Sequence, residues 1–260
     1  MASEFSPKAE ISPKAKIGNN CKIHPFVYIE DNVVIGDDCV IHPFVSILNG
    51  SRIGNRNRIF QGSVISALPE DFEFKGADTE VIVGNNNVIR ENVVINRGTH
   101  EGGQTIVGNN NFLMEGVHIL HDTKVGNQCV FGYSTKIAGD SVLDDGAILS
   151  SAVLQLPKTR VGKGAFVTAG SIFNKDVPPY CIMGGYPIAF TGVNSPMCKL
   201  IGIDEKVIKH IGNAYRLIYN GGTSLFDAIL QVREQVPDSE EIRTIIEFAE
   251  ASEKGLAGRK

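Results

Sequence analysis

The sequence predicts a mainly β protein: a left-handed parallel β-helix of hexapeptide repeats, followed by a small C-terminal α-helical domain. Three observations lead to this prediction. An aliphatic residue recurs at every sixth position, glycine-asparagine motifs recur at every third of these hexads, and the six-residue period stops after "DVPPY" at 176–180. A period of six is neither the 3.6-residue period of an α-helix nor the alternation of a flat strand. It is typical of a β-helix in which each hexad supplies a short strand and a corner.

Isoleucine marks the first part of the repeat, at each sixth position from Ile11 to Ile65. The phase resumes at Val83 and runs to Phe173, and Gln155 is the only polar residue at these positions after 107. Three hexads make one triangular coil, so we expect about nine stacked coils whose interior is filled by these side chains. The two interruptions preserve the phase. We interpret them as loops that leave a corner, where functional residues are often found.

The corners carry a second repeat. "IGNN" at 17–20, "IGDD" at 35–38 and "IGNR" at 53–56 are spaced by three hexads, which make one coil. Glycine and asparagine tolerate the left-handed backbone conformations that sharp corners require. Residues that are three hexads apart in the chain are therefore expected to stack on one another.

A helical pattern replaces the hexads in the last part of the chain. Asp204 is a candidate N-cap for a helix to 219, Thr223 for a helix to about 235, and Ser239 for a helix to about 252. The predicted domains are a hexapeptide β-helix of residues 1–190, with loops at 66–82 and 96–106, and a helical domain of residues 191–260. We expect the tail after residue 254 to be frayed.

The composition excludes several classes of protein. A formal charge of −4 argues against a nucleic-acid partner, and no apolar run is long enough for insertion into a membrane. The N-terminus lacks a signal-peptide core, and the five scattered cysteines form no CxxC pair, as expected for reduced thiols in the cytoplasm.

The stretch "HILHDTKVG" at 118–126 is the strongest candidate for a site. His121 and Asp122 replace the usual corner residues, and one coil further on lies Gly139. This arrangement suits acyl transfer: His121 as general base, Asp122 to orient it, and the Gly139 N–H to stabilise an oxyanion. The alternative is a solvated turn. No third ligand of suitable spacing is present, so no metal site is predicted.

Structural roles are predicted for three other histidines. His118 alone is typical of a packing or hydrogen-bonding residue. His24 and His42 both lie in "IHPF", one coil apart, and are expected to form a stacked ladder.

Four segments resemble the acyl-ACP:UDP-N-acetylglucosamine O-acyltransferases of lipid A biosynthesis. They are "IRENVVINRGT" (89–99), "NFLMEGVHILHDTKVGN" (111–127), "DVPPY" (176–180) and "NAYRLIY" (213–219). The resemblance covers essentially the whole chain. It implies a cytoplasmic homotrimer of the Gram-negative bacterial type, with active sites between neighbouring prisms. It also implies transfer of a 3-hydroxyacyl group from acyl carrier protein to the 3-hydroxyl of UDP-N-acetylglucosamine, with no cofactor beyond the carrier thioester.

The resemblance assigns roles to individual residues. His121 would be the general base, Asp122 its partner and Gly139 the oxyanion donor. The substrate-binding residues it implies are Asp71 and His118 for the sugar nucleotide, Asn194 near the nucleotide or acyl channel, and Ala169 for acyl length.

Several family positions differ in this chain. A loop lysine is replaced by Glu73, with Lys75 as a possible substitute; the other changes are Asp140, Leu156, Pro157, Pro196 and Leu200. The loss of cationic groups weakens the expected contacts to a diphosphate. Arg90, Arg97, Lys199 and Arg216 are candidates to replace them, and Lys199, Lys206, Lys209 and Arg216 to dock the acidic carrier protein.

Two alternatives stay open. One is the same chemistry on another sugar-nucleotide acceptor. The other is a non-catalytic trimeric paralogue that binds acyl carrier protein or sugar nucleotide.

Overall fold

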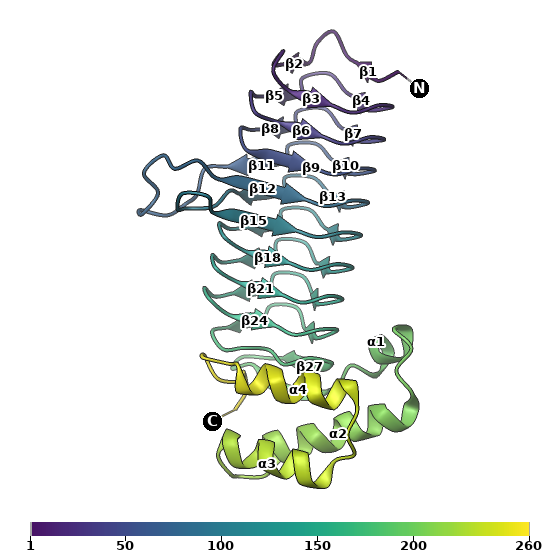
Figure 1. Ribbon diagram of the computed structural model, residues 1–260, viewed down its shortest axis with the longest axis vertical. Helices are drawn as coiled ribbons and strands as arrows, with labels where there is room; N and C mark the ends of the chain where they lie inside the picture. Colours follow the sequence, from purple (N-terminus) through teal and green to yellow (C-terminus); the bar gives the residue numbers. More distant parts are fainter. Residues whose placement is uncertain (1, 260) are drawn as a thin grey trace.

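The computed structural model describes residues 2–259 and confirms the predicted β-helix with a helical C-terminal domain (Figure 1). Three sheets of 11, 9 and 8 strands form the sides of a prism, and the chain visits them in turn. Residues three hexads apart pair in successive regular coils, as Lys22 pairs with Val40.

The first sheet contains β1 (Glu4–Phe5), β4 (Lys22–Ile23), β7 (Val40–Ile41), β10 (Arg58–Ile59), β13 (Val88–Ile89), β16 (Phe112–Leu113), β19 (Val130–Phe131), β22 (Ile148–Leu149), β25 (Phe166–Val167), β27 (Cys181–Gly184) and β28 (Ala189–Val193). The second contains β2 (Glu10–Ile11), β5 (Tyr28–Ile29), β8 (Ser46–Ile47), β11 (Val64–Ala67), β14 (Val94–Asn96), β17 (His118–Ile119), β20 (Lys136–Ile137), β23 (Leu154–Gln155) and β26 (Ile172–Phe173). The third contains β3 (Lys16–Ile17), β6 (Val34–Ile35), β9 (Ser51–Ile53), β12 (Glu80–Val83), β15 (Gln104–Val107), β18 (Lys124–Val125), β21 (Val142–Leu143) and β24 (Arg160–Val161).

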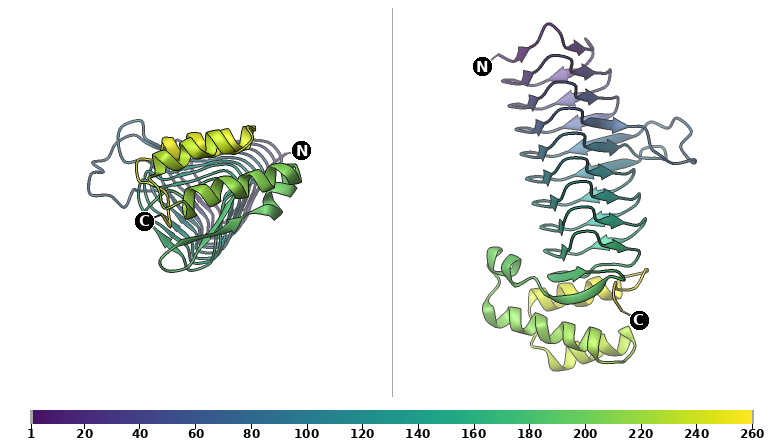
Figure 2. Two further views of the ribbon diagram at one scale, coloured as in Figure 1. Left: turned by 90° about the horizontal axis from the view of Figure 1, so that it is seen from below. Right: turned by 180° about the vertical axis from the view of Figure 1, so that it is seen from behind.

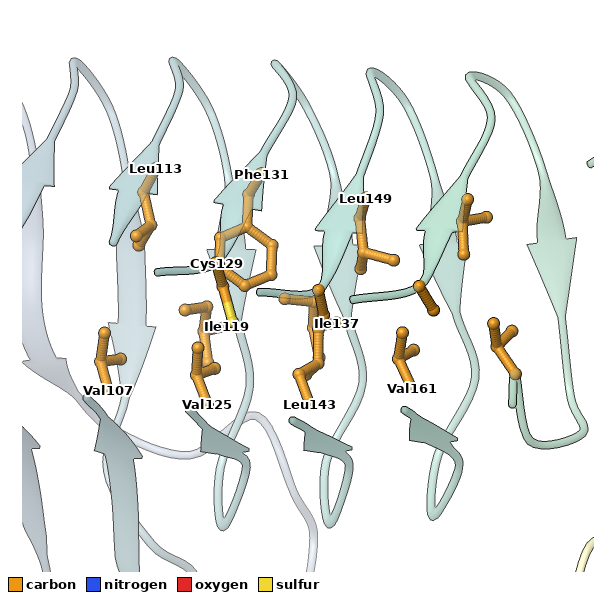
Figure 3. Close-up of a cluster of buried hydrophobic side chains, with 14 of the residues drawn as sticks. Val107, Leu113, Ile119, Val125, Cys129, Phe131, Ile137, Leu143, Leu149 and Val161 are labelled. Atoms are coloured by element: carbon orange, nitrogen blue, oxygen red, sulfur yellow. The ribbon is translucent and has the colours of Figure 1, made fainter. Parts of the chain in front are cut away.

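The hexad side chains fill the prism. Leu113, Phe131 and Leu149 point into its interior from consecutive coils (Figure 3), and each is fully buried. Burial of such a side chain contributes about 1.5–3 kcal/mol, and the contribution repeats in every coil. Gln155 occupies the same kind of position, and its Nε2 donates to Thr159 O at 3.0 Å. Its Oε1 has no hydrogen-bond partner within residues 2–259, so the backbone acceptor satisfies only one end of the buried amide.

The corners also form ladders. The His24 and His42 rings stack with their centroids 5.2 Å apart, as the sequence predicts, and Phe60 continues the stack. Asn20 has a φ of 56°, the left-handed conformation expected at a sharp corner.

Strands of the β-helix lie outside the run of predicted hexads at both ends, within the predicted range of residues 1–190. β1 precedes the first predicted hexad, and β27 pairs in parallel with β25 beyond residue 178. β28 then returns antiparallel to β27, so the change of architecture falls within Ala189–Val193.

Four helices follow: α1 (Ser195–Leu200), α2 (Glu205–Asn220), α3 (Leu225–Gln235) and α4 (Glu240–Glu250). They gather at the C-terminal end of the prism (Figure 2). Asp204 and Ser239 are N-caps as predicted, but Ser224, not Thr223, caps α3 by accepting from Asp227 N. α1 was not predicted, because its six residues are too few to show a helical period.

The expectation of a frayed tail is wrong for residues 255–259, and Lys260 lies outside the described residues. Leu256 is 1% exposed, and Asp176 N donates to Gly255 O at 2.9 Å while Ala257 N donates to Asp176 O at 2.7 Å. The tail thus pairs with a segment that lies much earlier in the chain. None of the helices in residues 2–259 has the length and apolar character needed to cross a membrane.

Candidate active site

The two predicted loops leave the same corner of the prism, between the second and third sheets. They connect β11 to β12 and β14 to β15, and they project side by side from the prism (Figure 1). Residues 120–123, 138–141 and 156–159 form this corner in the next three coils. We call this edge of the prism the loop corner.

His121 lies at the loop corner between two carboxylates. Its Nδ1 lies 3.1 Å from Asp122 Oδ2, and its Nε2 lies 3.4 Å from Asp71 Oδ2 of the first loop. An ionised carboxylate can only accept, so Asp122 favours the tautomer with the proton on Nδ1. The His121 side chain is largely buried, with a residue exposure of 8%. The ring is therefore held in one orientation.

Asp122 also anchors the second loop. Its Oδ2 accepts a hydrogen bond from Thr99 N at 2.9 Å. A Cβ added to Gly98 or Gly103 would lie 2.8 Å from Asp122 Oδ1, so both glycines permit the loop to approach the carboxylate closely. A single side chain thus orients the imidazole and positions the loop.

Gly139 lies directly beneath the imidazole, as the spacing of one coil predicts. A Cβ built on Gly139 would overlap His121 Cε1 and lie 2.5 Å from Nε2. Within residues 2–259, no group accepts a hydrogen bond from the Gly139 N–H, whereas the next N–H, that of Asp140, donates to His121 O at 3.2 Å. The corner therefore presents a free backbone donor next to the histidine.

These groups open into a cavity of about 460 Å³. The lining includes His121, Gly139 and His100, together with five carboxylates and one lysine. The carboxylates are Glu70, Asp71, Glu73, Asp122 and Asp140, and the lysine is Lys158. His100 Nε2 lies 3.5 Å from Glu73 Oε2, so the tips of the two loops are in contact across the cavity mouth. A polar cavity of this size suits a sugar ring.

His118 lies beside this cavity without lining it. It points outward from β17, and its Nε2 lies 2.6 Å from Asn96 Oδ1, while Asn96 Nδ2 donates to Leu68 O. Burial lowers the pKa of His118, so its ring stays neutral near pH 7. The ring supports the bases of both loops.

The other predicted binding residues do not line this cavity. Lys75 Nζ donates to Phe72 O within its own loop. Ala169 lies at the corner between the first and second sheets. Asn194 caps α1, and its Nδ2 donates to Gly164 O at the corner between the third and first sheets.

The cationic residues that were expected to replace the family's lost diphosphate contacts also lie outside the cavity. Arg90 pairs with Glu91, Arg97 stacks on Phe74, and Lys199 pairs with Glu205. Neither these three residues nor Arg216 lines the cavity. Lys158 does line it, and the sequence analysis missed it. One coil separates Asp122 from Asp140, and one more coil separates Asp140 from Lys158. The spacing of the repeat could therefore have predicted that Lys158 lies at the same corner.

No three His, Cys, Asp or Glu side chains in residues 2–259 are grouped to hold a metal ion. The groups at the loop corner are an imidazole, a carboxylate that contacts its Nδ1, and a backbone N–H without an acceptor in residues 2–259. That set of groups can catalyse acyl transfer without a metal.

The prism and the site define the class of bacterial hexapeptide transferases. Residues 14–49, 32–67 and 104–139 match the family described as bacterial transferase hexapeptide. Residues 176–257 match the second domain of the family described as UDP-N-acetylglucosamine O-acyltransferase.

Comparison with individual proteins narrows the class. The chain is 36% identical over 260 residues to the acyl-[acyl-carrier-protein]–UDP-N-acetylglucosamine O-acyltransferase of Stenotrophomonas maltophilia, covering 98% of both chains. The UDP-N-acetylglucosamine acyltransferase of Bacteroides fragilis superposes with a TM-score of 0.95 at 51% identity, over 97% of this chain and 99% of the other. The UDP-N-acetylglucosamine acyltransferase of Francisella novicida superposes with a TM-score of 0.94 at 34% identity, over 98% of this chain and 94% of the other. The chain belongs to the acyl-ACP–UDP-N-acetylglucosamine O-acyltransferase family.

Proposed function

We propose that this protein transfers a 3-hydroxyacyl group from acyl carrier protein to the 3-hydroxyl of UDP-N-acetylglucosamine, the first step of lipid A biosynthesis, with His121 as the general base. Family membership supports the reaction. The single observation that supports the assignment of the base is the stack of His121 on Gly139, with Asp122 behind the ring.

The steps follow from this geometry. His121 Nε2 accepts the proton of the acceptor hydroxyl, and the oxygen attacks the thioester carbonyl carbon. The Gly139 N–H donates to the oxyanion of the tetrahedral intermediate. Collapse of the intermediate breaks the C–S bond, and the leaving sulfur takes the proton from Nε2. The Asp122 carboxylate stabilises the imidazolium between the two proton transfers.

Asp71 has a binding role in this proposal. Its Oδ2 lies 3.4 Å from His121 Nε2, so a sugar hydroxyl beside the pair can donate to Nε2 while Asp71 accepts from a neighbouring group of the sugar. His118 acts indirectly, through Asn96 and the loops. Lys75 would need to leave Phe72 O before it could contact a substrate.

We further propose that the active form is a homotrimer with sites between copies. Ala169 and Asn194 lie at two corners other than the loop corner. One chain therefore cannot bring them to its own His121, but a neighbouring prism can bring either to the cavity. In this arrangement Ala169 would limit acyl length and Asn194 would lie near the nucleotide or the acyl chain.

An acyl-transfer assay tests the reaction. It would use UDP-N-acetylglucosamine and 3-hydroxyacyl carrier proteins of several chain lengths. We expect product with the wild-type protein and a loss of turnover of at least ~100-fold in His121→Ala. His24→Ala removes a histidine at another corner and is the matched control.

Other outcomes would separate the alternatives. Near-wild-type turnover by a trimeric His121→Ala protein would exclude His121 as the base. The acidic wall of the cavity makes a different sugar-nucleotide acceptor the second candidate. A wild-type trimer that acylates only another sugar nucleotide would support that candidate. Binding of carrier protein without any transfer would support the non-catalytic paralogue.

A further inference from the structure

Within residues 2–259, Lys158 is the only lysine or arginine that lines the cavity, which also contains five carboxylates. Both substrates of the proposed reaction are anionic, since the acceptor carries a diphosphate and the donor a phosphopantetheine phosphate. Carboxylates in a partly enclosed cavity repel such groups. An anionic substrate therefore needs a cationic partner here, and this chain supplies one.

Three of the five carboxylates lie on the N-terminal side of His121, whereas Lys158 lies on the other side, where Asp140 is the one lining carboxylate within residues 2–259. Glu70, Asp71 and Glu73 belong to the first loop, on the N-terminal side of His121. Lys158 lies on the other side, one coil beyond Gly139. Adjacent strands are about 4.8 Å apart, so the Lys158 backbone is roughly 10 Å from the corner that holds His121. The flexible lysine side chain can cover part of this distance.

The backbone of Lys158 is fixed while its amine is free. Lys158 N donates to Gly139 O at 3.1 Å, which ties the residue to the coil of the proposed oxyanion donor. Its Nζ has no hydrogen bond or ion pair with any group in residues 2–259, although Asp140 occupies the equivalent corner position one coil earlier. Lys136 and Lys175, by contrast, donate to Gly116 O and Arg259 O.

We propose that Lys158 binds a phosphate group of a substrate, on the side of His121 that faces the helical domain, and so determines affinity for that substrate. This inference rests on the acyl-transfer function proposed above. The phosphate can belong to the diphosphate of the sugar nucleotide or to the phosphopantetheine of the donor. In either case the anion lies away from the acidic first loop.

The kinetic test uses Lys158→Met, which keeps the length of the side chain and removes its charge. We expect the KM for one substrate to rise about 10-fold while kcat changes by less than about twofold, a loss of about 1.4 kcal/mol in binding. Lys158→Arg should restore most of the affinity. Lys22→Met removes an exposed lysine from β4, several coils away, and is the matched control.

Binding measurements identify the phosphate. If the nucleotide is the ligand, Lys158→Met weakens calorimetric binding of UDP about 10-fold and leaves uridine unaffected. If the donor is the ligand, the variant loses its preference for acyl-4′-phosphopantetheine over acyl-pantetheine. Either result supports the proposal, and the two results distinguish the source of the phosphate.

The proposal would be overturned by a Lys158→Met protein with wild-type KM values and wild-type affinity for UDP and phosphopantetheine. If His121→Ala is inactive in the same assay, the proposed reaction still stands. If the wild-type protein shows no transfer, the proposed reaction fails, and the binding measurements still test whether Lys158 binds a phosphate. A wild-type protein that binds neither phosphate compound also overturns the proposal.

Discussion

The imidazole of His121 lies against the backbone of Gly139, one coil further along the chain, and leaves no room for a side chain there. The contact has a simple origin. In a parallel β-helix whose coil is three hexads long, residues one coil apart lie above one another. The glycine permits the ring to settle against the corner, and it leaves a backbone N–H beside Nε2.

Gly139→Ala should therefore remove activity without unfolding the protein. The added methyl group would overlap His121 Cε1 and lie 2.5 Å from Nε2, so the ring must turn away from its position. We expect kcat to fall at least ~100-fold, since a displaced general base loses its contribution.

The matched control is Gly212→Ala in α2, where the new Cβ meets only Val193 Cγ2, at 3.9 Å. This variant should keep wild-type kcat and gain about 0.5–1 kcal/mol in stability from helix propensity. A fully active Gly139→Ala protein would show that the ring does not need its observed position.

Asp122→Asn should separate the charge of Asp122 from its geometry. An asparagine oxygen at the place of Oδ2 can still accept from Thr99 N and His121 Nδ1, and asparagine tolerates the φ of 57° at this residue. The lost negative charge would no longer stabilise the imidazolium. We expect turnover to fall by up to about 10⁴-fold, the loss seen when the aspartate behind a catalytic histidine becomes asparagine, with little change in thermal stability.

Asp122→Ala is the comparison. It removes the anchor of the second loop as well, so its melting temperature should fall below that of the asparagine variant. If Asp122→Asn kept wild-type turnover, the carboxylate would serve only to position the loop.

His118 should make stability depend on pH below its unfolded pKa of 6.5. Burial is the main cause that lowers the pKa of the folded-state ring; Glu70 opposes it and Lys136 adds to it. Above about pH 7 the ring is neutral in both states, so its contribution is constant. As the pH falls from 6.5 through the lower folded-state pKa, the unfolded chain binds the proton first, and the folded state loses stability.

Urea unfolding of wild type and His118→Gln, at equal protein concentration, measures this effect. Relative to the variant, the wild-type protein should be less stable at about pH 5.5 than at about pH 7.5. A difference in free energy of unfolding that is the same at both pH values would contradict the lowered pKa.

Leu256→Ala should destabilise the protein although it changes a residue near the C-terminus. The side chain is 1% exposed and belongs to the hydrophobic core. Removal of a buried leucine costs about 2–5 kcal/mol, which thermal or denaturant unfolding would detect. Leu200→Ala, at an exposed leucine of α1, is the control and should have little effect. Equal stability of the two variants would mean that the tail is frayed after all.

The β-helix and the pairing of His121 with Gly139 could be predicted because both are consequences of a local repeat. Each hexad makes the same strand and corner, so a count of residues along the chain locates stacked neighbours. The same count leads to Lys158, which the sequence analysis did not extend far enough to reach. The short elements β1, β27 and α1 were missed because such short segments give no period to detect.

The repeat in the chain was thus sufficient to predict the prism, the coil of three hexads and the candidate base with its partners. The contacts of the loops and of the C-terminal segments, by contrast, were decided only by the tertiary structure. Leu256 is buried because the tail pairs with Asp176, and Asn194 is engaged because Gly164 O lies beside it. Asp122 holds the second loop through Thr99 N, and two of the cations expected to replace the missing ones, Arg90 and Lys199, pair with carboxylates outside the cavity. These contacts join residues with no fixed spacing, so their energies depend on packing in three dimensions and leave no periodic signal in the chain.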